Sequence, residues 1–341
     1  MQDIWGKLKE ETRPILIYGT GNGADKLIDR LNSLGIKISG VFASNGFVRN
    51  RSFRGFPVLS EEVAGHQFGD FVALQSFGTN RAEVLSYIKA LKKRVTLYMP
   101  EVPVADEEYF DLEFARKHKE KLQKVYNALA DDFSKKTFRN LIMFKLTGEI
   151  DYLFSCETEE NDLSTILNLK NGDSYLDLGA YNGDTVLQFL EKVGENGEIT
   201  AVEPDKKTFK KLEKNLEGKN ISLINAAVGD INGQVNFGTF GSRGSHLGGE
   251  EKIQGITIDK ICKNRGFNFI KFDVEGAELK AIIGGEKTIG RDKPKMLISC
   301  YHKSEDYFAI PLKILEINPQ YKIYMRHYPS LPAWDTNFYF I

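Results

Sequence analysis

Short apolar runs alternate with stretches of helical spacing in the first hundred residues, which is the pattern of a parallel sheet built from strand–helix–strand units. Strands are predicted at 14–19, 38–44, 71–78 and 95–100, with helices at 24–35 and after residue 79. The segment FRGFPVLS is interpreted as a Gly- and Pro-containing loop ending in Ser60, a candidate cap for the helix that begins at Glu61. We therefore expect a small α/β domain over residues 1–105.

The hydrophobic pattern changes to helical spacing from 106 to about 150 and returns to strand–helix alternation after it. Residues 106–150 are therefore interpreted as a helical connector and residues 151–341 as a second α/β domain. In this second domain YKIYMRHYP and TNFYFI are predicted to form an antiparallel hairpin at the end of the sheet, because they are aromatic-rich and joined by a short Pro-containing loop.

Composition places the chain among folded globular proteins. Hydrophobic residues make up 41% and charged residues 27%, and the net charge is −1, so nothing in the charge balance favours nucleic acid as a partner. No apolar run is long enough for a membrane span. Cys156, Cys262 and Cys300 are too scattered for a disulfide framework or a zinc knuckle, so we expect a reducing compartment, the cytoplasm.

The stretch from Asp177 to Thr185 lies between a predicted strand and a predicted helix. Its glycines allow a sharp turn close to a ligand, and ligands bind at the carboxyl ends of parallel strands. Glu203 ends the next strand, where a carboxylate accepts hydrogen bonds from both hydroxyls of a ribose. The turn and the acid together favour a nucleotide-type ligand, and the alternative is a structural turn followed by a surface glutamate.

These motifs resemble the FkbM family of S-adenosylmethionine-dependent methyltransferases. The resemblance rests on YLDLGAYNGDT, AVEPD, NAAVGD and above all IKFDVEGAELKAIIGG, and it runs from about residue 150 to the C-terminus. It implies a class I methyltransferase domain with a mostly parallel seven-stranded sheet and S-adenosyl-L-methionine as cofactor. One departure is that a Glu-x-His strand end is expected after the Asp-x-Glu-Gly motif, whereas this chain has Ser299-Cys300-Tyr301-His302.

The resemblance also implies a set of cofactor-binding residues, with the glycine turn at the methionine part, the acid at the ribose and the later segment at the adenine edge. The full set is Asp177, Gly179, Ala180, Tyr181, Asn182, Gly183, Asp184, Thr185, Glu203, Pro204, Asn225, Ala226, Ala227 and Asp273.

Methyl transfer requires that the acceptor be positioned against the methyl group of the cofactor, which is already activated. A hydroxyl acceptor also requires a base. Asp273, Glu275 and His302 are the candidate catalytic residues, with Glu275 or His302 as the base. The alternatives are that Glu275 caps a helix and that His302 is a satisfied polar group. No metal is predicted, since Asp273 alone offers too few oxygen ligands.

The Gly- and Ser-rich stretch 237–252 joins two predicted strands. It is interpreted either as a flap over the acceptor, with Arg243 and His246 facing the substrate, or as a plain hairpin loop.

In the first domain Gly19, Gly21 and Ala24 form a GxGxxA turn that suits a pyrophosphate. The second strand ends in Ala43-Ser44-Asn45, without the acid that an NAD ribose needs. The domain resembles the small Rossmann-like domain that precedes catalytic modules in sugar-modifying enzymes, which leaves a scaffold role and a nucleotide or nucleotide-sugar ligand both open.

We therefore predict a methyltransferase that acts on a hydroxyl of a sugar or other small-molecule acceptor such as a secondary metabolite. Two rival hypotheses are an NAD(P)- or nucleotide-sugar-binding enzyme that uses the first domain, and a binding module without turnover.

Overall fold

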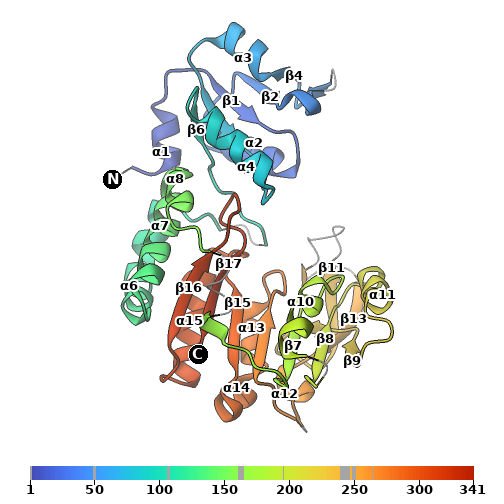
Figure 1. The fold of residues 1–341 in the computed structure, drawn as a ribbon. Helices are drawn as coiled ribbons and strands as arrows, with labels where there is room; N and C mark the ends of the chain where they lie inside the picture. Colours follow the sequence, from blue (N-terminus) through green and yellow to red (C-terminus); the bar gives the residue numbers. More distant parts are fainter. Residues whose placement is uncertain are drawn as a thin grey trace.

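The computed structural model describes residues 2–48, 51–105, 108–159, 165–194, 196–238, 246–247, 251–263 and 265–341. It contains two large sheets, and Figure 1 shows the N-terminal one stacked above the C-terminal one. One hydrophobic core runs through both, since Leu16 and Phe42 of the first sheet belong to the same cluster as Leu176 and Phe338 of the second. Apolar burial therefore joins the two halves of the molecule.

The N-terminal sheet has six strands in the order β3-β4-β2-β1-β5-β6, and every neighbouring pair is parallel except β3 with β4. The strands are β1 (Ile15–Tyr18), β2 (Gly40–Ala43), β3 (Ser52–Phe53), β4 (Phe56–Ser60), β5 (Val72–Gln75) and β6 (Thr96–Tyr98). The accompanying helices are α1 (Ile4–Lys9), α2 (Asn22–Ser33), the 3-10 helix η1 (Asn45–Phe47), α3 (Glu61–Phe68) and α4 (Ala82–Leu91).

The loop predicted for FRGFPVLS is wrong, because this segment contains the last residue of β3 and all of β4. Pro57 pairs with Ser52 at the start of β4, and the ladder to β2 begins only at Val58, so the missing N–H of proline interrupts no parallel pairing. The predicted cap is confirmed: Ser60 Oγ accepts a hydrogen bond from Val63 N at 3.2 Å.

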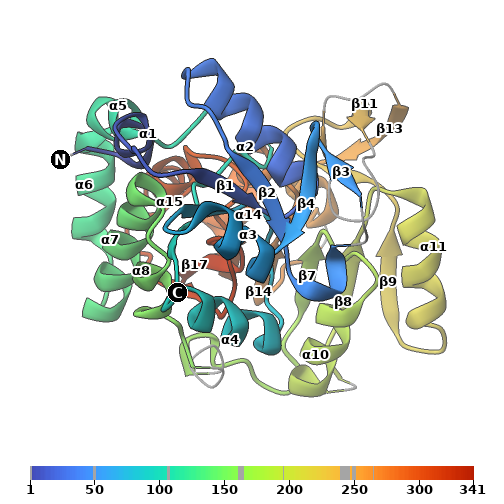
Figure 2. The same cartoon turned by 90° about the horizontal axis from the view of Figure 1, so that it is seen from above.

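Helices follow from residue 112 to residue 154: α5 (Leu112–Lys117), α6 (Lys119–Ala128), α7 (Asp132–Thr147) and α8 (Asp151–Phe154). Figure 2 shows them along one side of the molecule. Their docking on the second sheet is polar as well as apolar, since Arg326 donates to Asp131 at 2.8 Å and Met325 N donates to Ser134 Oγ at 2.9 Å. The connector is thus fixed to strand β16 (Ile323–His327).

The C-terminal sheet has seven strands in the order β16-β17-β15-β14-β7-β8-β9, and β17 alone runs antiparallel to its neighbours. Its other strands are β7 (Tyr175–Leu178), β8 (Ile199–Val202), β9 (Ile221–Ile224), β14 (Phe269–Phe272), β15 (Lys295–Ser299) and β17 (Thr336–Phe340). The helices are α10 (Asp184–Val193), α11 (Lys206–Asn215), α12 (Ile258–Ile261), α13 (Glu278–Ile283), α14 (Glu286–Asp292) and α15 (Asp306–Ile317). The predicted mostly parallel sheet and its closing hairpin are confirmed.

A third, four-stranded sheet has the order β10-β13-β11-β12, from β10 (Ala227–Val228), β11 (Gly233–Gly238), β12 (His246–Leu247) and β13 (Glu251–Ile256). It spans part of the predicted flap. Arg243 lies outside the described residues, and His246 is described only as part of strand β12, so the flap stays a prediction. Within the described part of the chain, no helix has both the length and the apolar character that a bilayer crossing requires.

Candidate active site

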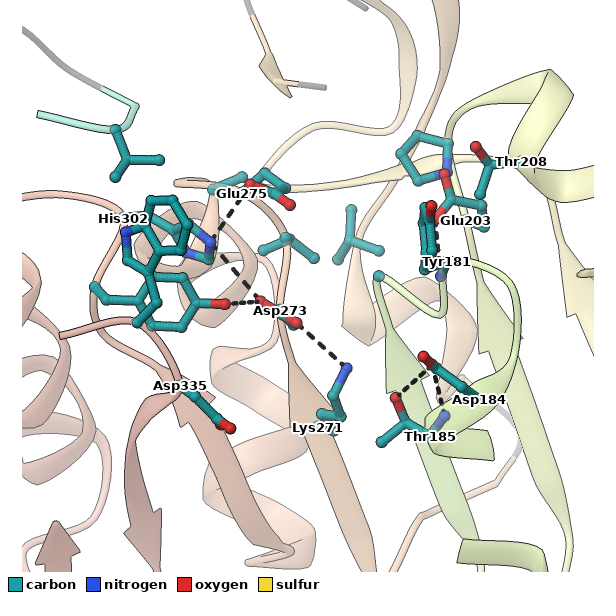
Figure 3. Close-up of a pocket in the computed structure, with 18 of the residues that line it drawn as sticks. Tyr181, Asp184, Thr185, Glu203, Thr208, Lys271, Asp273, Glu275, His302 and Asp335 are labelled. Atoms are coloured by element: carbon teal, nitrogen blue, oxygen red, sulfur yellow. Dashed lines mark hydrogen bonds and ion pairs between the residues drawn. The ribbon is translucent and has the colours of Figure 1, made fainter. Parts of the chain in front are cut away.

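A cavity of about 470 Å³ lies at the carboxyl ends of β7, β8, β14 and β15. This is the edge of a parallel sheet where ligands bind, and the volume is in the range of small-molecule and cofactor sites. Residues 78–80 of the N-terminal domain contribute to its wall together with residues of the C-terminal domain. Figure 3 shows Tyr181, Glu203 and Thr208 on one side of the cavity and Glu275 and His302 on the other.

The glycine turn after β7 lets the backbone approach β14. Gly179 has a φ of +83°, and a Cβ at this position would lie 1.9 Å from the carbonyl oxygen of Asp273. Tyr181 also adopts a positive φ, +48°, which is strained for a residue with a side chain. Helix α10 then begins at Asp184, whose Oδ1 accepts from Thr185 N at 2.8 Å. The turn therefore lies close against the end of β14, and its residues Gly179 and Tyr181 line the cavity.

Glu203 follows β8 directly and lines the cavity. Its Oε2 accepts from Tyr181 N at 3.0 Å, and its Oε1 accepts from Asp205 N at 2.9 Å. Burial raises the pKa of Glu203 to about 7, although these two backbone hydrogen bonds favour the carboxylate. Asn225 Nδ2 donates a hydrogen bond to the carbonyl oxygen of Glu203 at 2.8 Å and so stabilises the end of β8. The carboxylate is thus oriented before a ligand arrives.

Asp177 is fully buried beneath the cavity and does not line it. Tyr175 Oη donates to its Oδ2 at 2.6 Å, and Lys271 Nζ donates to its Oδ1 at 3.2 Å. Lys271 also lies 3.7 Å from Asp273 Oδ2. Burial works against the charge of Lys271, but the two aspartates outweigh it and raise its pKa. Asp177 therefore anchors a lysine at the floor of the site.

A histidine surrounded by carboxylates forms the opposite side of the cavity. His302 is 2% exposed, and its Nδ1 lies 2.9 Å from Glu278 Oε1. Its Nε2 lies 3.5 Å from Glu275 Oε2 and 3.8 Å from Asp273 Oδ1. Burial alone would lower the pKa of His302, but Glu278 and the other two carboxylates raise it to about 10. Tyr301 Oη donates to Asp273 Oδ1 at 3.2 Å.

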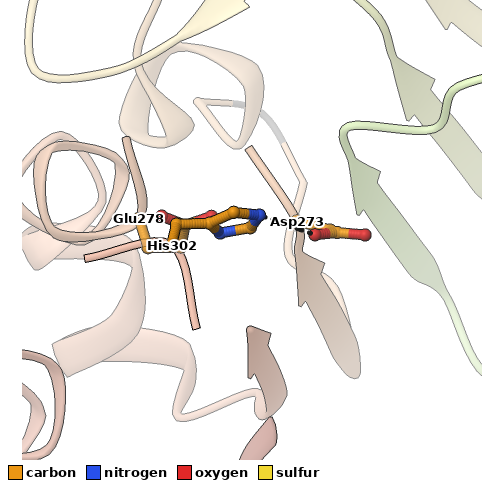
Figure 4. A group of neighbouring side chains, drawn as sticks. All are labelled: Asp273, Glu278 and His302. Carbon is orange, nitrogen blue, oxygen red and sulfur yellow. Dashed lines mark ion pairs between the residues drawn. The ribbon is translucent and has the colours of Figure 1, made fainter. Parts of the chain in front are cut away.

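Asp273, Glu278 and His302 each have a possible metal-ligand atom within 4.8 Å of the other two. Figure 4 shows, however, that the imidazole ring lies between the two carboxylates. Glu278 is at Nδ1 and Asp273 is on the Nε2 side, so the three side chains do not converge on one point. The geometry is that of a histidine ion-paired with carboxylates on both sides of its ring, and the absence of a metal stays a prediction.

Residues 177–323 match the family model described as the methyltransferase FkbM domain. The chain carries a methyltransferase FkbM domain. The match covers less than half of the chain and indicates an S-adenosylmethionine-dependent methyltransferase domain over these residues. No curated protein matches the sequence.

A solved structure agrees with this at the level of the fold. The FkbM methyltransferase of Methylobacillus flagellatus shares 23% sequence identity, with a TM-score of 0.75 over 97% of this chain and 90% of that chain. The fold thus extends through the N-terminal domain as well as the FkbM domain. Fibrillarin of Aeropyrum pernix, crystallised with natively bound S-adenosyl-L-methionine, shares 18% identity and covers 53% of this chain and 74% of that chain, with a TM-score of 0.35.

The cavity of the FkbM domain collects most of the predicted site residues. Those lining it are Gly179, Tyr181, Asp184, Thr185, Glu203, Pro204, Ala227, Asp273, Glu275 and His302. Those that do not line it are Asp177, Ala180, Asn182, Gly183, Asn225 and Ala226. Of the second group, Gly183 has a φ of +88° and ends the turn, and Asn225 donates a hydrogen bond to the carbonyl oxygen of Glu203.

Sequence analysis missed several residues of the site. Lys271 precedes Asp273 by two positions, and strand periodicity places both residues on the same side. The sequence could therefore have predicted Lys271 as a residue of the site. Glu278 stands in the Asp-Val-Glu-Gly-Ala-Glu motif, but its pairing with His302 depends on the adjacency of β14 and β15. Trp334 and residues 78–80 had no local signal, since only the docking of the two domains brings them to the cavity.

Proposed function

We propose that this chain transfers the methyl group of S-adenosylmethionine to a hydroxyl oxygen of a small molecule or saccharide. The observation that carries the proposal is the arrangement of one cavity with an oriented glutamate, Glu203, on one side and the pair of His302 and Glu275 on the other. The first side suits the ribose of the cofactor, and the second suits an acceptor that must lose a proton.

On the cofactor side, each oxygen of Glu203 already accepts one backbone hydrogen bond and retains a lone pair for a ribose hydroxyl. Gly179, Tyr181 and Asp184 would hold the methionine part, and Ala227 would face the adenine. When bound, the cofactor supplies an activated methyl group on a sulfonium. The protein then has to position the acceptor and remove its proton.

On the acceptor side, we assign His302 as the base and Glu278 as its positioning residue. Glu278 at Nδ1 fixes the ring so that Nε2 faces Glu275 and Asp273 at the cavity. The neighbouring carboxylates favour the imidazolium, which cannot accept a proton. The base is therefore available only in the molecules whose His302 is neutral, and this fraction grows as the pH rises toward 10.

The first test is calorimetric titration with S-adenosylhomocysteine. We expect micromolar binding to the wild type and a loss of at least about 30-fold in Glu203→Ala, since a buried acceptor of two hydrogen bonds is removed. Glu198→Ala is the matched control, because Glu198 is an exposed acid that precedes the same strand at its other end. Unchanged affinity in Glu203→Ala would contradict the ribose assignment.

The same titration separates the rival functions. Binding of NADH or UDP-glucose in place of S-adenosylhomocysteine would favour the first domain as the functional one. Binding of S-adenosylhomocysteine without methyl transfer to any hydroxylated acceptor would favour a module that lacks turnover. The cytoplasmic location also stays a prediction; Cys156, Cys262 and Cys300 are free and buried, as a reducing compartment allows.

The base assignment predicts that kcat rises with pH from 7 toward 10, because only neutral His302 accepts a proton. Glu278→Gln removes a carboxylate that raises the pKa of His302, so the rise should move to lower pH. His302→Gln should abolish the rise. If Glu275→Gln abolishes transfer and Glu278→Gln leaves the profile in place, Glu275 is the base instead.

A further inference from the structure

The loop after β5 belongs to the N-terminal domain but reaches the cavity of the FkbM domain. Thr79 and Leu331 exchange two backbone hydrogen bonds, from Thr79 N at 2.6 Å and from Leu331 N at 2.8 Å. Gly78, Thr79 and Asn80 all line the cavity. The backbone of one domain is therefore paired with the backbone of the other at the mouth of the site.

Trp334 forms the other half of this contact. A Cβ at Gly78 would lie 2.2 Å from the indole ring, so glycine is the residue that allows the loop to lie against it. Trp334 nevertheless remains 39% exposed and lines the cavity. The buried Ser330 holds the loop by donating to the carbonyl oxygen of Trp334. A large aromatic surface is thus fixed in place and left uncovered beside polar groups.

The charges around this cavity limit what it can take. Five of the described residues that line it are acids: Asp184, Glu203, Asp273, Glu275 and Asp335. Lys271 and His302 are the basic residues among the described lining, and both already lie beside carboxylates. An anionic acceptor such as a phosphorylated sugar would meet net negative charge in a partly desolvated site. A neutral acceptor avoids this repulsion.

We propose that residues 78–80 and Trp334 form the acceptor subsite, and that this subsite takes an uncharged ring bearing hydroxyl groups. The proposal rests on the methyl transfer proposed above. The face of the ring would pack on the indole of Trp334, and its hydroxyls would bond to Asn80 and Asp335. The N-terminal domain would then act in acceptor recognition, and residues 78–80 would determine specificity.

The two tryptophans allow a direct test. Trp5 is buried in α1, so Trp5→Phe leaves Trp334 as the single indole fluorophore. With saturating S-adenosylhomocysteine, the probes are methyl glucoside, methyl galactoside, methyl mannoside and methyl rhamnoside, with UDP-glucose as the anionic comparison. We expect at least one glycoside to lower acrylamide quenching of Trp334 about twofold and UDP-glucose to leave it unchanged. Protection by UDP-glucose, or by none of the glycosides, would overturn the proposed ligand class.

The role of the loop is tested by Asn80→Ala against the control Arg81→Ala. Arg81 is the exposed neighbour, paired with Glu83, and does not line the cavity. We expect Asn80→Ala to weaken the glycoside about fivefold, the loss of one hydrogen bond, while the Kd for S-adenosylhomocysteine stays within twofold. Equal glycoside affinity in both variants would remove the loop from the subsite. Failure of S-adenosylhomocysteine to bind the wild type would instead contradict the proposed function itself.

Discussion

The molecule contains two glycine turns with the same local design and different surroundings. Each follows a buried parallel strand, β1 or β7, and opens a helix, α2 or α10. Each has its first glycine at positive φ, +118° for Gly19 and +83° for Gly179. The two turns therefore share the order strand, positive-φ glycine and helix that the sequence pattern detects, although the residue before each helix differs, with φ −102° at Gly21 and +88° at Gly183.

The difference lies at the end of the second strand. In the FkbM domain Glu203 stands there, facing the cavity and bonded to the backbone of the turn. In the N-terminal domain Ser44 stands there, and its Oγ is 2.6 Å from Tyr18 Oη, so the protein itself supplies a partner. A glycine turn by itself therefore indicates close packing of the backbone. Ribose binding is favoured only where an oriented acid lies beside the turn.

The largest effect is expected from Gly179→Ala. The new Cβ would collide with the carbonyl oxygen of Asp273 at 1.9 Å, and φ is unfavourable for alanine, so we expect a loss of about 3 kcal/mol in the free energy of unfolding. Binding of S-adenosylhomocysteine should fall at least tenfold, because the turn and β14 must separate. Urea unfolding and calorimetry measure the two effects. Wild-type affinity in a destabilised variant would show that the turn does not shape the cofactor site.

Gly23→Ala makes the corresponding change at the N-terminal turn and so tests whether the two turns differ in cofactor binding. Its Cβ would lie 2.1 Å from the carbonyl oxygen of Ser76, so we expect a loss of about 2 kcal/mol, partly offset by the better helix propensity of alanine in α2. In contrast to Gly179→Ala, the Kd for S-adenosylhomocysteine should stay within twofold. A parallel loss of affinity would mean that the two domains act as one unit in cofactor binding.

The same contrast explains what could be predicted from sequence. Apolar runs located β1 and β7, and the strand end before Glu203 located the acid, because both depend on local pattern. β4 was missed, since its Gly and Pro neighbours are those of a loop while its pairing with β2 is a tertiary contact. The contact between Trp334 and Gly78 joins segments that are distant in the sequence, so no local sequence pattern predicts it.

The pH dependence of cofactor binding is a smaller, graded effect that belongs to the Glu203 side alone. Burial places the pKa of Glu203 at about 7, and only the carboxylate accepts both ribose hydroxyls. The affinity for S-adenosylhomocysteine should therefore be level above pH 7 and fall by up to tenfold per unit below it. Glu203→Gln should bind weakly with a flat profile from pH 5 to 8. A sloping profile in that variant would assign the titration to another group.

The smallest effect is expected from Gly21→Ala, at the point where a pyrophosphate would approach the N-terminal turn. Gly21 has φ −102° and ψ −171°, which alanine adopts readily, and a Cβ would meet nothing within 4 Å. The free energy of unfolding should change by less than about 0.5 kcal/mol, because the weaker helix cap and the lower entropy of the unfolded chain oppose each other. The Kd for S-adenosylhomocysteine should not change. If this turn serves packing alone, titration with NADH and UDP-glucose will give the same result for the variant and the wild type. A nucleotide that binds the wild type but does not bind Gly21→Ala would show that both turns bind a ligand.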